Sequence, residues 1–227
     1  MRSPSRALLF VLTFTLPLGG LFAACSNGAT ATPNAGHDSG PDDRRIDRAR
    51  LEDAIVISTA GGCDVLIETP PLLPSPHVPV GSEILYNSNP PSSGPHFPIW
   101  AAFQEFTTPV PRGYYVHDLE HGAVVLLYKC DPASTTSPTC TEIQTALRET
   151  MTSLPADPVC TATNGPPGPA LRVVMTPDPD LDVPIAAAAW GWTYKAKCLD
   201  TASLKKFAND HYNQGTENIC GNGQTAF

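Results

Sequence analysis

The stretch that decides the fold is residues 117–129, HDLEHGAVVLLYK. Its second part, from Ala123 to Lys129, is a continuous apolar run of strand length. Such a run is typical of a central strand that is buried on both faces of a sheet. Its first part contains two histidines and a glutamate. The stretch therefore predicts a buried strand that begins directly after a group of side chains suited to metal binding or acid–base chemistry.

The spacing of the two histidines gives the first functional hypothesis. A helical turn would place His117 and His121, four residues apart, on one face, where two imidazoles can bind one metal ion. The string also fits H-x-x-E-H, the inverted zinc-protease signature, in which the glutamate activates water. That signature makes Glu120 the candidate catalytic residue. The context argues against such a protease, because Gly122 and the strand follow at once and leave a helix of about one turn.

Other segments complete an α+β fold with a single domain. The predicted strands cover residues 65–67, 123–129, 171–175 and 184–195, and the predicted helices cover residues 139–154 and 201–212. Four alanines in residues 184–195 leave a helix as the alternative there. In residues 139–154 the apolar side chains recur at spacings of four, four and three, which is one helix face, and Thr139 or Thr141 can cap its start. We expect a small mixed β-sheet with two helices packed on it.

Between the first two strands the chain is rich in proline. Residues 69–111, here called the wrap, hold eleven of the 25 prolines. The missing N–H groups exclude a regular helix or a central strand. The wrap also carries Phe97, Trp100, Phe103 and Phe106, whose rings favour burial. We therefore expect an ordered, irregular segment packed by its aromatic side chains.

Two further histidines belong to the candidate metal site. His96 lies between Pro95 and Pro98 in the wrap, and a restricted loop of this kind holds a ligand or general base in place. His211 ends the last predicted helix, where it can alternatively cap the helix C-terminus as a cation. The predicted ligands are His96, His117 and His121, completed by His211 or Glu120. Imidazole suits zinc and copper about equally, and an open coordination position would make the ion catalytic.

The first 24 residues are typical of a secretory signal. Arg2 and Arg6 precede an apolar run, and small residues stand directly before Cys25. That ending resembles the lipobox of bacterial lipoproteins, in which the cysteine becomes the acylated first residue. The alternative is an ordinary signal peptide that leaves Cys25 as a spare thiol. We predict a signal peptide over residues 1–24, a lipidated cysteine and flexible tether over residues 25–55, and the domain over residues 56–227, held outside the cytoplasm at a membrane of the cell envelope.

The six remaining cysteines form an even set, which in an exported chain predicts disulfides. Fifteen pairings are possible for six cysteines. Local pairs, Cys130 with Cys140 or Cys160 and Cys198 with Cys220, are plausible. Wide, irregular spacings without a CxxC pair make thiolate zinc ligation the weaker alternative. The candidates are Cys63, Cys130, Cys140, Cys160, Cys198 and Cys220.

Composition and motifs exclude other functions. With 14 Lys and Arg against 22 Asp and Glu, the formal net charge is −8, which argues against non-specific nucleic-acid binding. The sequence contains no phosphate-binding glycine motif for a nucleotide and no G-x-S-x-G elbow for a hydrolase. The alternative to a metal-binding domain is a non-enzymatic binding module, in which the wrap presents aromatic side chains to a protein or glycan partner. The sequence does not decide whether the protein is an enzyme.

Several blocks resemble a known family. They are YNSNPPSSGPH at 86–96, GYY at 113–115, HDLEHGAVVLLY at 117–128, AAAAWGW at 186–192 and the final helix with Phe207. Together they resemble the bacterial domain of unknown function 3105 family over residues 60–220. The resemblance implies a membrane-anchored or secreted bacterial protein without an assigned reaction. It marks the same five candidate residues as parts of the family pattern: His96, His117, Glu120, His121 and His211.

Overall fold

The structure is a computed structural model that describes residues 55–58, 62–164 and 169–227. The predicted signal peptide, Cys25 and almost all of the predicted tether lie outside these residues. Within the described part of the chain, no helix combines the length and the apolar character that crossing a membrane requires.

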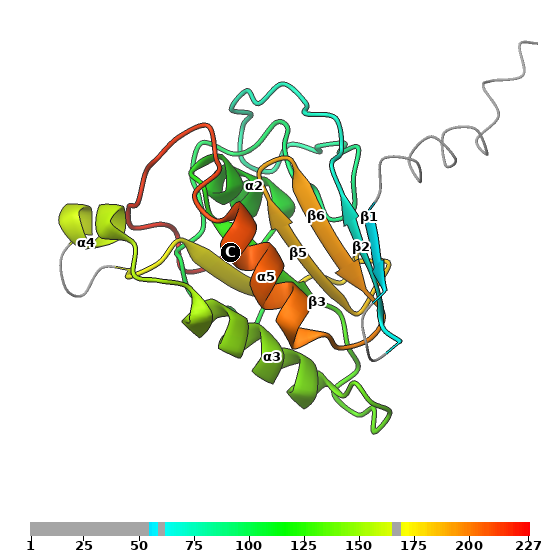
Figure 1. The fold of residues 1–227 in the computed structure, drawn as a ribbon. Helices are drawn as coiled ribbons and strands as arrows, with labels where there is room; N and C mark the ends of the chain where they lie inside the picture. Colours follow the sequence, from blue (N-terminus) through cyan, green and yellow to red (C-terminus); the bar gives the residue numbers. More distant parts are fainter. Residues whose placement is uncertain (1–54, 59–61, 165–168) are drawn as a thin grey trace, which may run out of the picture. The chain divides into compact units, whose positions relative to one another are not determined.

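A mixed six-stranded sheet forms the centre of the domain (Figure 1). Its strand order is β1-β2-β6-β5-β3-β4; β3 and β4 run parallel and every other neighbouring pair is antiparallel. The strands are β1 (Ile55–Ser58), β2 (Asp64–Glu68), β3 (Val124–Tyr128), β4 (Val173–Pro177), β5 (Ile185–Ala189) and β6 (Trp192–Ala196). This arrangement confirms the predicted α+β class with one mixed sheet.

Four described helices accompany the sheet: α2 (Arg112–Glu120), α3 (Cys140–Ser153), α4 (Pro158–Asn164) and α5 (Thr201–His211). Helices α3 and α5 pack against each other and cover one face of the sheet (Figure 1). Helix α2 and the wrap cover the other face. Because parallel strands need a crossover connection, the chain passes through α3 and α4 between β3 and β4.

Strand β3 is buried along its whole length, as the apolar run predicts. Its side chains alternate between two separate cores. Val125 and Leu127 pack towards α2 and the wrap, whereas Val124, Leu126 and Tyr128 pack towards α3 and α5. A strand with two buried faces therefore divides the domain into two hydrophobic layers.

Helix α3 follows the sequence prediction closely. Thr139 is its N-cap: the hydroxyl accepts a hydrogen bond from the Glu142 N–H, and the Glu142 carboxylate accepts one from the Thr139 N–H. This reciprocal capping box satisfies donors that the first turn leaves without partners. Its buried residues include Ile143 and Leu147, which are four residues apart, as the predicted apolar face requires.

The prediction of one strand over residues 184–195 was wrong. The segment folds back as a hairpin in which β5 pairs with β6. Gly191 makes the turn at a φ of +75°, a left-handed conformation that favours glycine. The apolar run hid this turn, because a buried strand pair and one long strand have the same composition. Strand β1 and helices α2 and α4 were also not predicted as elements.

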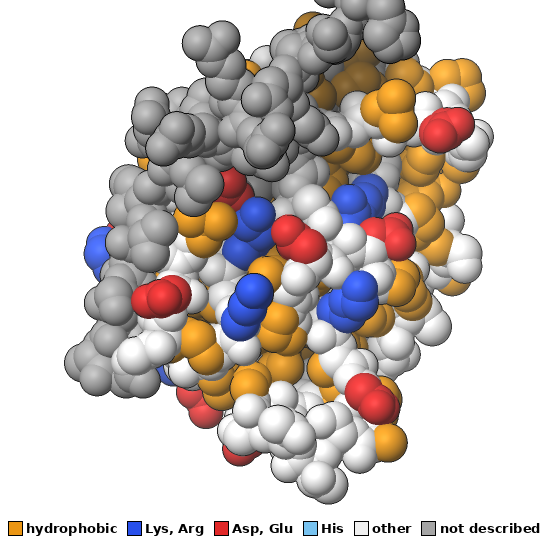
Figure 2. Space-filling view, turned by 90° about the vertical axis from the view of Figure 1, so that its right-hand side faces the viewer, with side chains coloured by type: hydrophobic (Ala, Val, Ile, Leu, Met, Phe, Trp, Pro, Cys, Tyr) orange, Lys and Arg blue, Asp and Glu red, His pale blue; other side chains and the backbone are white. Residues whose placement is uncertain are grey.

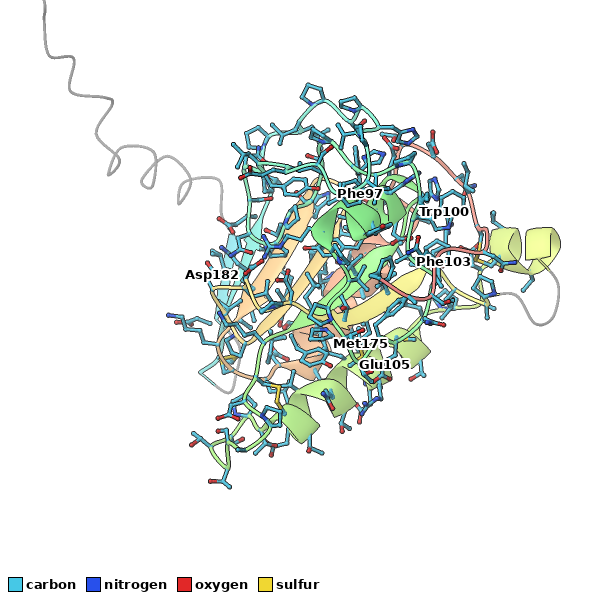
Figure 3. All side chains as sticks on the ribbon, turned by 180° about the vertical axis from the view of Figure 1, so that it is seen from behind. Phe97, Trp100, Phe103, Glu105, Met175 and Asp182 are labelled. Atoms are coloured by element: carbon cyan, nitrogen blue, oxygen red, sulfur yellow. A yellow bond between two sulfur atoms is a disulfide. The ribbon has the colours of Figure 1, made fainter. Side chains whose placement is uncertain are left out.

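The wrap contains no named helix or strand before α2, as its prolines predict. Phe97, Phe103 and Phe106 are buried and join the core beneath α2. In Figure 3, which shows the domain from behind, Phe97, Trp100, Phe103 and Glu105 follow one another across the sheet towards Met175 of β4. There the Met175 N–H donates to Gln104 O and the Phe106 N–H to Met175 O, so the wrap pairs with the outer edge of β4.

The six described cysteines form three disulfides, as predicted for an exported domain. They join Cys63 to Cys198, Cys130 to Cys140, and Cys160 to Cys220. The local pair Cys130–Cys140 is among those expected. The expected pair Cys198–Cys220 was wrong, because β6 brings Cys198 to the start of β2, while the segment after α5 carries Cys220 to α4.

Candidate metal centre

Helix α2 supplies the first two residues of the centre. It is longer than the predicted single turn, because it begins at Arg112 and ends at Glu120. His117 and Glu120, three residues apart, lie on one face, and both are buried. Gly113 lets the wrap approach this helix: a Cβ there would lie 2.6 Å from the Phe97 ring. The Phe97 N–H donates to Gly113 O, which fixes the wrap against the first turn of α2.

The wrap supplies two histidines from a short local repeat. Pro76-His77-Val78-Pro79 and Pro95-His96-Phe97-Pro98 share the pattern P-H-x-P. The two copies lie beside each other: the His96 N–H donates to Pro76 O at 3.2 Å, and the Val78 N–H donates to His96 O at 2.8 Å. This bridge brings both imidazoles to α2.

The result is a group of three imidazoles and one carboxylate. One possible ligand atom from each member lies within 4.8 Å of the others. The ring centroids of the three histidines are 4.7–5.0 Å apart. Three members are buried and His77 is exposed. The members of this group, here called the His3Glu cluster, are His77, His96, His117 and Glu120.

Backbone carbonyls fix the ring orientation of two of these histidines. Nδ1 of His96 lies 2.9 Å from Gly94 O, and Nδ1 of His117 lies 2.7 Å from Phe97 O. Because a carbonyl oxygen only accepts, each Nδ1 carries the hydrogen, and Nε2 of the neutral ring presents a lone pair. Metal-binding histidines typically make this second contact, which sets the tautomer and aims the free nitrogen.

Within the cluster, His96 Nε2 lies 3.0 Å from Glu120 Oε2. His96 Nε2 is buried and makes no hydrogen bond of acceptable geometry within the described residues. With a neutral ring, both atoms carry lone pairs and repel each other unless a cation lies between them. A proton satisfies this pair alone, whereas a metal ion satisfies the pair together with His77 and His117.

Burial keeps the histidines on α2 in the form that binds metals. It lowers the pKa of His117 to about 4, although the hydrogen bond to Phe97 O acts in the opposite direction. The neighbouring His96 and His77 lower it further. His117 is therefore neutral at pH 7, as a metal ligand must be.

His121 lies beside the cluster but is not one of its four members. It is the C-cap of α2, and its ring is 4.5 Å from the His117 ring, centroid to centroid. The Trp100 ring packs edge-on against it, and its Nε2 lies 3.2 Å from Glu217 Oε2. The expected i, i+4 spacing thus places the two rings side by side, but Glu120 and not His121 joins His117 in the cluster, and Nε2 of His121 faces Glu217 instead.

His211 is also absent from the four-residue cluster. It ends α5, and its ring stacks on Trp192 with the centroids 4.2 Å apart and also contacts the Phe207 ring at 4.7 Å. Burial lowers the pKa of His211, which weakens its alternative role as a cation at the helix end. These contacts make it part of the packing between α5 and β6.

The histidine that sequence reasoning missed is His77. It is exposed and lies in a proline-rich segment without periodicity, so no pattern of a helix or strand selects it. The usable signal was its P-H-x-P context, which His96 repeats 19 residues later.

The segment after α5 packs on the C-terminal end of α2 and forms backbone hydrogen bonds with it. The Asn213 N–H donates to Gly122 O, and the Glu217 N–H donates to Glu120 O. Gly215 allows this approach, because a Cβ there would collide with the backbone oxygen of Glu120. The buried Arg172 side chain adds hydrogen bonds to His121 O, Asn213 Oδ1 and Asn218 Oδ1, and pairs with Asp157 at 2.8 Å.

Two surface features bear on the other functional hypotheses. On the face seen in Figure 2, basic and acidic side chains are interspersed, which differs from the basic patch of a nucleic-acid binder. Phe97, Phe103 and Phe106 are at most 9 % exposed. The burial predicted for the aromatic side chains of the wrap is therefore confirmed for these three, which pack inside the domain.

Fold and cluster together define a class: an α+β domain whose loop and helix bring three histidines and a glutamate together. The chain belongs to the family described as protein of unknown function (DUF3105), which matches residues 77–222. That range begins at His77 and includes the other three members of the cluster. No curated protein matches the chain. No solved structure matches it either.

Proposed function

We propose that this protein is an extracytoplasmic metal-binding domain that holds one zinc or copper ion in the His3Glu cluster. The observation that carries the proposal is the convergence of four ligand-type side chains, three of them buried, within 4.8 Å. Desolvating an unpaired carboxylate is costly, and an ion of opposite charge offsets that cost for Glu120.

The ligand set supports a nitrogen- and oxygen-binding divalent ion. Imidazole and carboxylate suit zinc and copper(II), whereas copper(I) favours thiolate and thioether ligands. The six described cysteines are in disulfides and offer no thiolate. Zinc and copper(II) therefore remain the two candidates, and their preferred geometries differ.

The number of protein ligands bears on whether the ion is structural or catalytic. Structural zinc sites have four protein ligands, whereas catalytic sites keep one position open for water or substrate. With Glu120 as a ligand, its carboxylate is not free to act as the base that the H-x-x-E-H pattern predicts. We therefore favour binding of the ion over metal-assisted hydrolysis.

The location outside the cytoplasm is the second half of the proposal. Disulfides persist in oxidising compartments, and the three bonds support export. We propose that the signal at residues 1–24 directs export and that lipid on Cys25 anchors the domain to a membrane. A Cys25→Ser variant is expected to leave the membrane fraction, and a variant that stays there would contradict the anchor.

Metal analysis of the exported full chain, purified without a histidine tag, tests the metal site. We expect one equivalent of zinc or copper for each chain. Elemental analysis identifies the ion, and electron paramagnetic resonance of a copper-loaded sample reports nitrogen ligands. Protein that takes up neither ion at micromolar concentration would contradict the proposal.

Two neighbouring histidines provide a matched pair of variants. Both His117 and His121 are buried on the last turns of α2, but only His117 belongs to the cluster. We expect His117→Gln to lose the ion and His121→Gln to retain it. Circular dichroism must show that both variants are folded. Loss of the ion in both variants, or in neither, would contradict the assignment of these ligands.

A further inference from the structure

The four members of the His3Glu cluster differ in how firmly they are held. His96 and His117 are buried, and a backbone carbonyl holds the ring of each. Glu120 is only 8 % exposed and is on the last turn of α2. His77 alone among the four is exposed, and its ring packs beside the His96 and His117 rings, with centroids 5.0 and 4.9 Å away.

The backbone of His77 is nevertheless anchored. The flanking residues Pro76 and Val78 both bond to His96 through the bridge between the two P-H-x-P copies. The ring of His77 therefore starts from a fixed point and can turn about its side-chain bonds. Exposed side chains change rotamer within nanoseconds, whereas a buried ring held by a carbonyl is restricted.

The dimensions of the cluster require some movement. Ligands of a tetrahedral zinc ion with bonds of about 2.0–2.1 Å are roughly 3.4 Å apart. The ligand atoms of the cluster are spread over as much as 4.8 Å, so they contract when an ion binds. The side chain with the greatest freedom to move inwards is the exposed one, His77.

We infer that His77 is the exchangeable ligand of the site, through which the ion is loaded and released. This inference rests on the proposed metal-binding function. His96, His117 and Glu120 are the three buried ligands that stay on the ion, and His77 completes the coordination from the solvent side. An incoming nitrogen donor binds the ion as the His77 nitrogen leaves; one coordination bond forms and one breaks, and the charge of the ion is unchanged.

The exposed position of His77 indicates the chemical class of the donor that would replace it on the ion. A donor that replaces His77 must reach the ion from solvent and offer a similar lone pair, which describes an imidazole group. Free imidazole is the smallest such donor, and it can occupy the space of the missing ring in a His77→Ala variant. Imidazole rescue is therefore the direct test of an open approach on this side of the cluster.

The experiment compares the exported full chain with its His77→Ala and His117→Ala variants. Zinc release to an excess of chelator gives the rate, and the visible spectrum of the cobalt(II)-loaded protein reports the ligands. We expect His77→Ala to bind one zinc ion and release it roughly 10-fold faster or more, with an altered cobalt spectrum. Millimolar imidazole is expected to restore both the wild-type spectrum and slow release.

His117→Ala is the buried counterpart and is expected to remain metal-free with or without imidazole. His117→Gln repeats this arm if the alanine variant does not fold. His77→Ala protein with the wild-type release rate and spectrum would overturn the inference while leaving the metal site in place. Equal rescue of both positions by imidazole, or rescue of neither, would also overturn it. Wild-type protein that binds no zinc or copper would instead overturn the proposed function.

Discussion

On one face of the sheet, α3 and α5 bury apolar side chains at helical spacing; on the other, the wrap and α2 bury a similar set without regular structure over most of its length. The first face is held by the periodicity of its helices. The second is held by individual contacts, such as the Phe97 N–H to Gly113 O and the Val110 N–H to Thr176 Oγ1. The His3Glu cluster lies on the second face. Loops place ligands from distant segments together, and they depend on specific contacts to keep them there.

The largest effect is expected at Arg172, which ties the end of α2 to the C-terminal segment. Arg172→Met leaves Asp157 buried without its cation and should cost about 3–5 kcal/mol of unfolding free energy. Burial raises the pKa of Asp157, but hydrogen bonds from Tyr212, Val159 and Arg172 lower it by more. The net pKa is below the ordinary value, so the carboxylate is charged at pH 7. Urea unfolding measures the loss.

Arg148→Met is the matched control, because Arg148 pairs with Glu105 at the surface. Exposed ion pairs contribute about 0–1 kcal/mol. Similar losses in the two variants would show that burial does not distinguish the two pairs.

Removing one disulfide from each face of the sheet tests the two faces against each other. Cys160–Cys220 closes 60 residues and fastens the segment above Glu120, whereas Cys130–Cys140 closes ten residues at the start of α3. Chain entropy predicts losses of roughly 4 and 3 kcal/mol for the corresponding double alanine variants. Only loss of Cys160–Cys220 should also weaken zinc binding, which titration against a chelator measures. Equal zinc affinities would mean that this segment does not support the cluster.

A smaller effect is expected where the wrap meets α2. Gly113→Ala places a methyl group against the Phe97 ring and should cost about 1–3 kcal/mol through overpacking. Zinc affinity should fall as well, because Phe97 O orients His117. Adding Phe97→Leu should recover part of the stability, and the double-mutant cycle measures this coupling. Independent, additive effects would contradict a close contact.

The smallest effect is expected on the face with α3. Thr139→Ala removes the hydroxyl of the capping box and should cost about 1 kcal/mol. Zinc affinity should not change, because this helix covers the opposite face of the sheet. The exposed Thr152→Ala is the control and should be close to neutral. A change in zinc affinity in Thr139→Ala would remove the functional distinction between the faces.

The two faces also differ in how well the sequence predicts them. Helices α3 and α5 follow from apolar periodicity, and strand β3 follows from a continuous apolar run that is buried on both faces. The wrap could be predicted to be ordered, but its path could not be predicted. Its prolines exclude a regular helix or central strand without indicating which conformation the chain adopts instead. The β5–β6 hairpin was missed because its turn depends on the backbone angle of Gly191, inside an apolar run.

The candidate site was predicted in part for the same reason. His96, His117 and Glu120 stand in conspicuous motifs, and the structure brings them together. His77 joins them through a bridge between two loop segments, and its sequence signal is the P-H-x-P repeat, which belongs to no helix or strand pattern. His121 and His211 are also histidines, the residue type expected of a ligand. Their rings instead contact Glu217 and Trp192, which are distant in the sequence.

The pairing of β2 with β6 has a consequence for how the protein is made. The second strand and the last strand are neighbours, and Cys63 bonds to Cys198 across 135 residues. A chain that emerges amino-terminus first must therefore wait for nearly all of its length before the sheet can close. Long-range pairing of this kind folds slowly. For the exported metal-binding protein that we propose, such a delay would favour passage through a translocation channel, which accepts unfolded chains, and metal loading would follow passage.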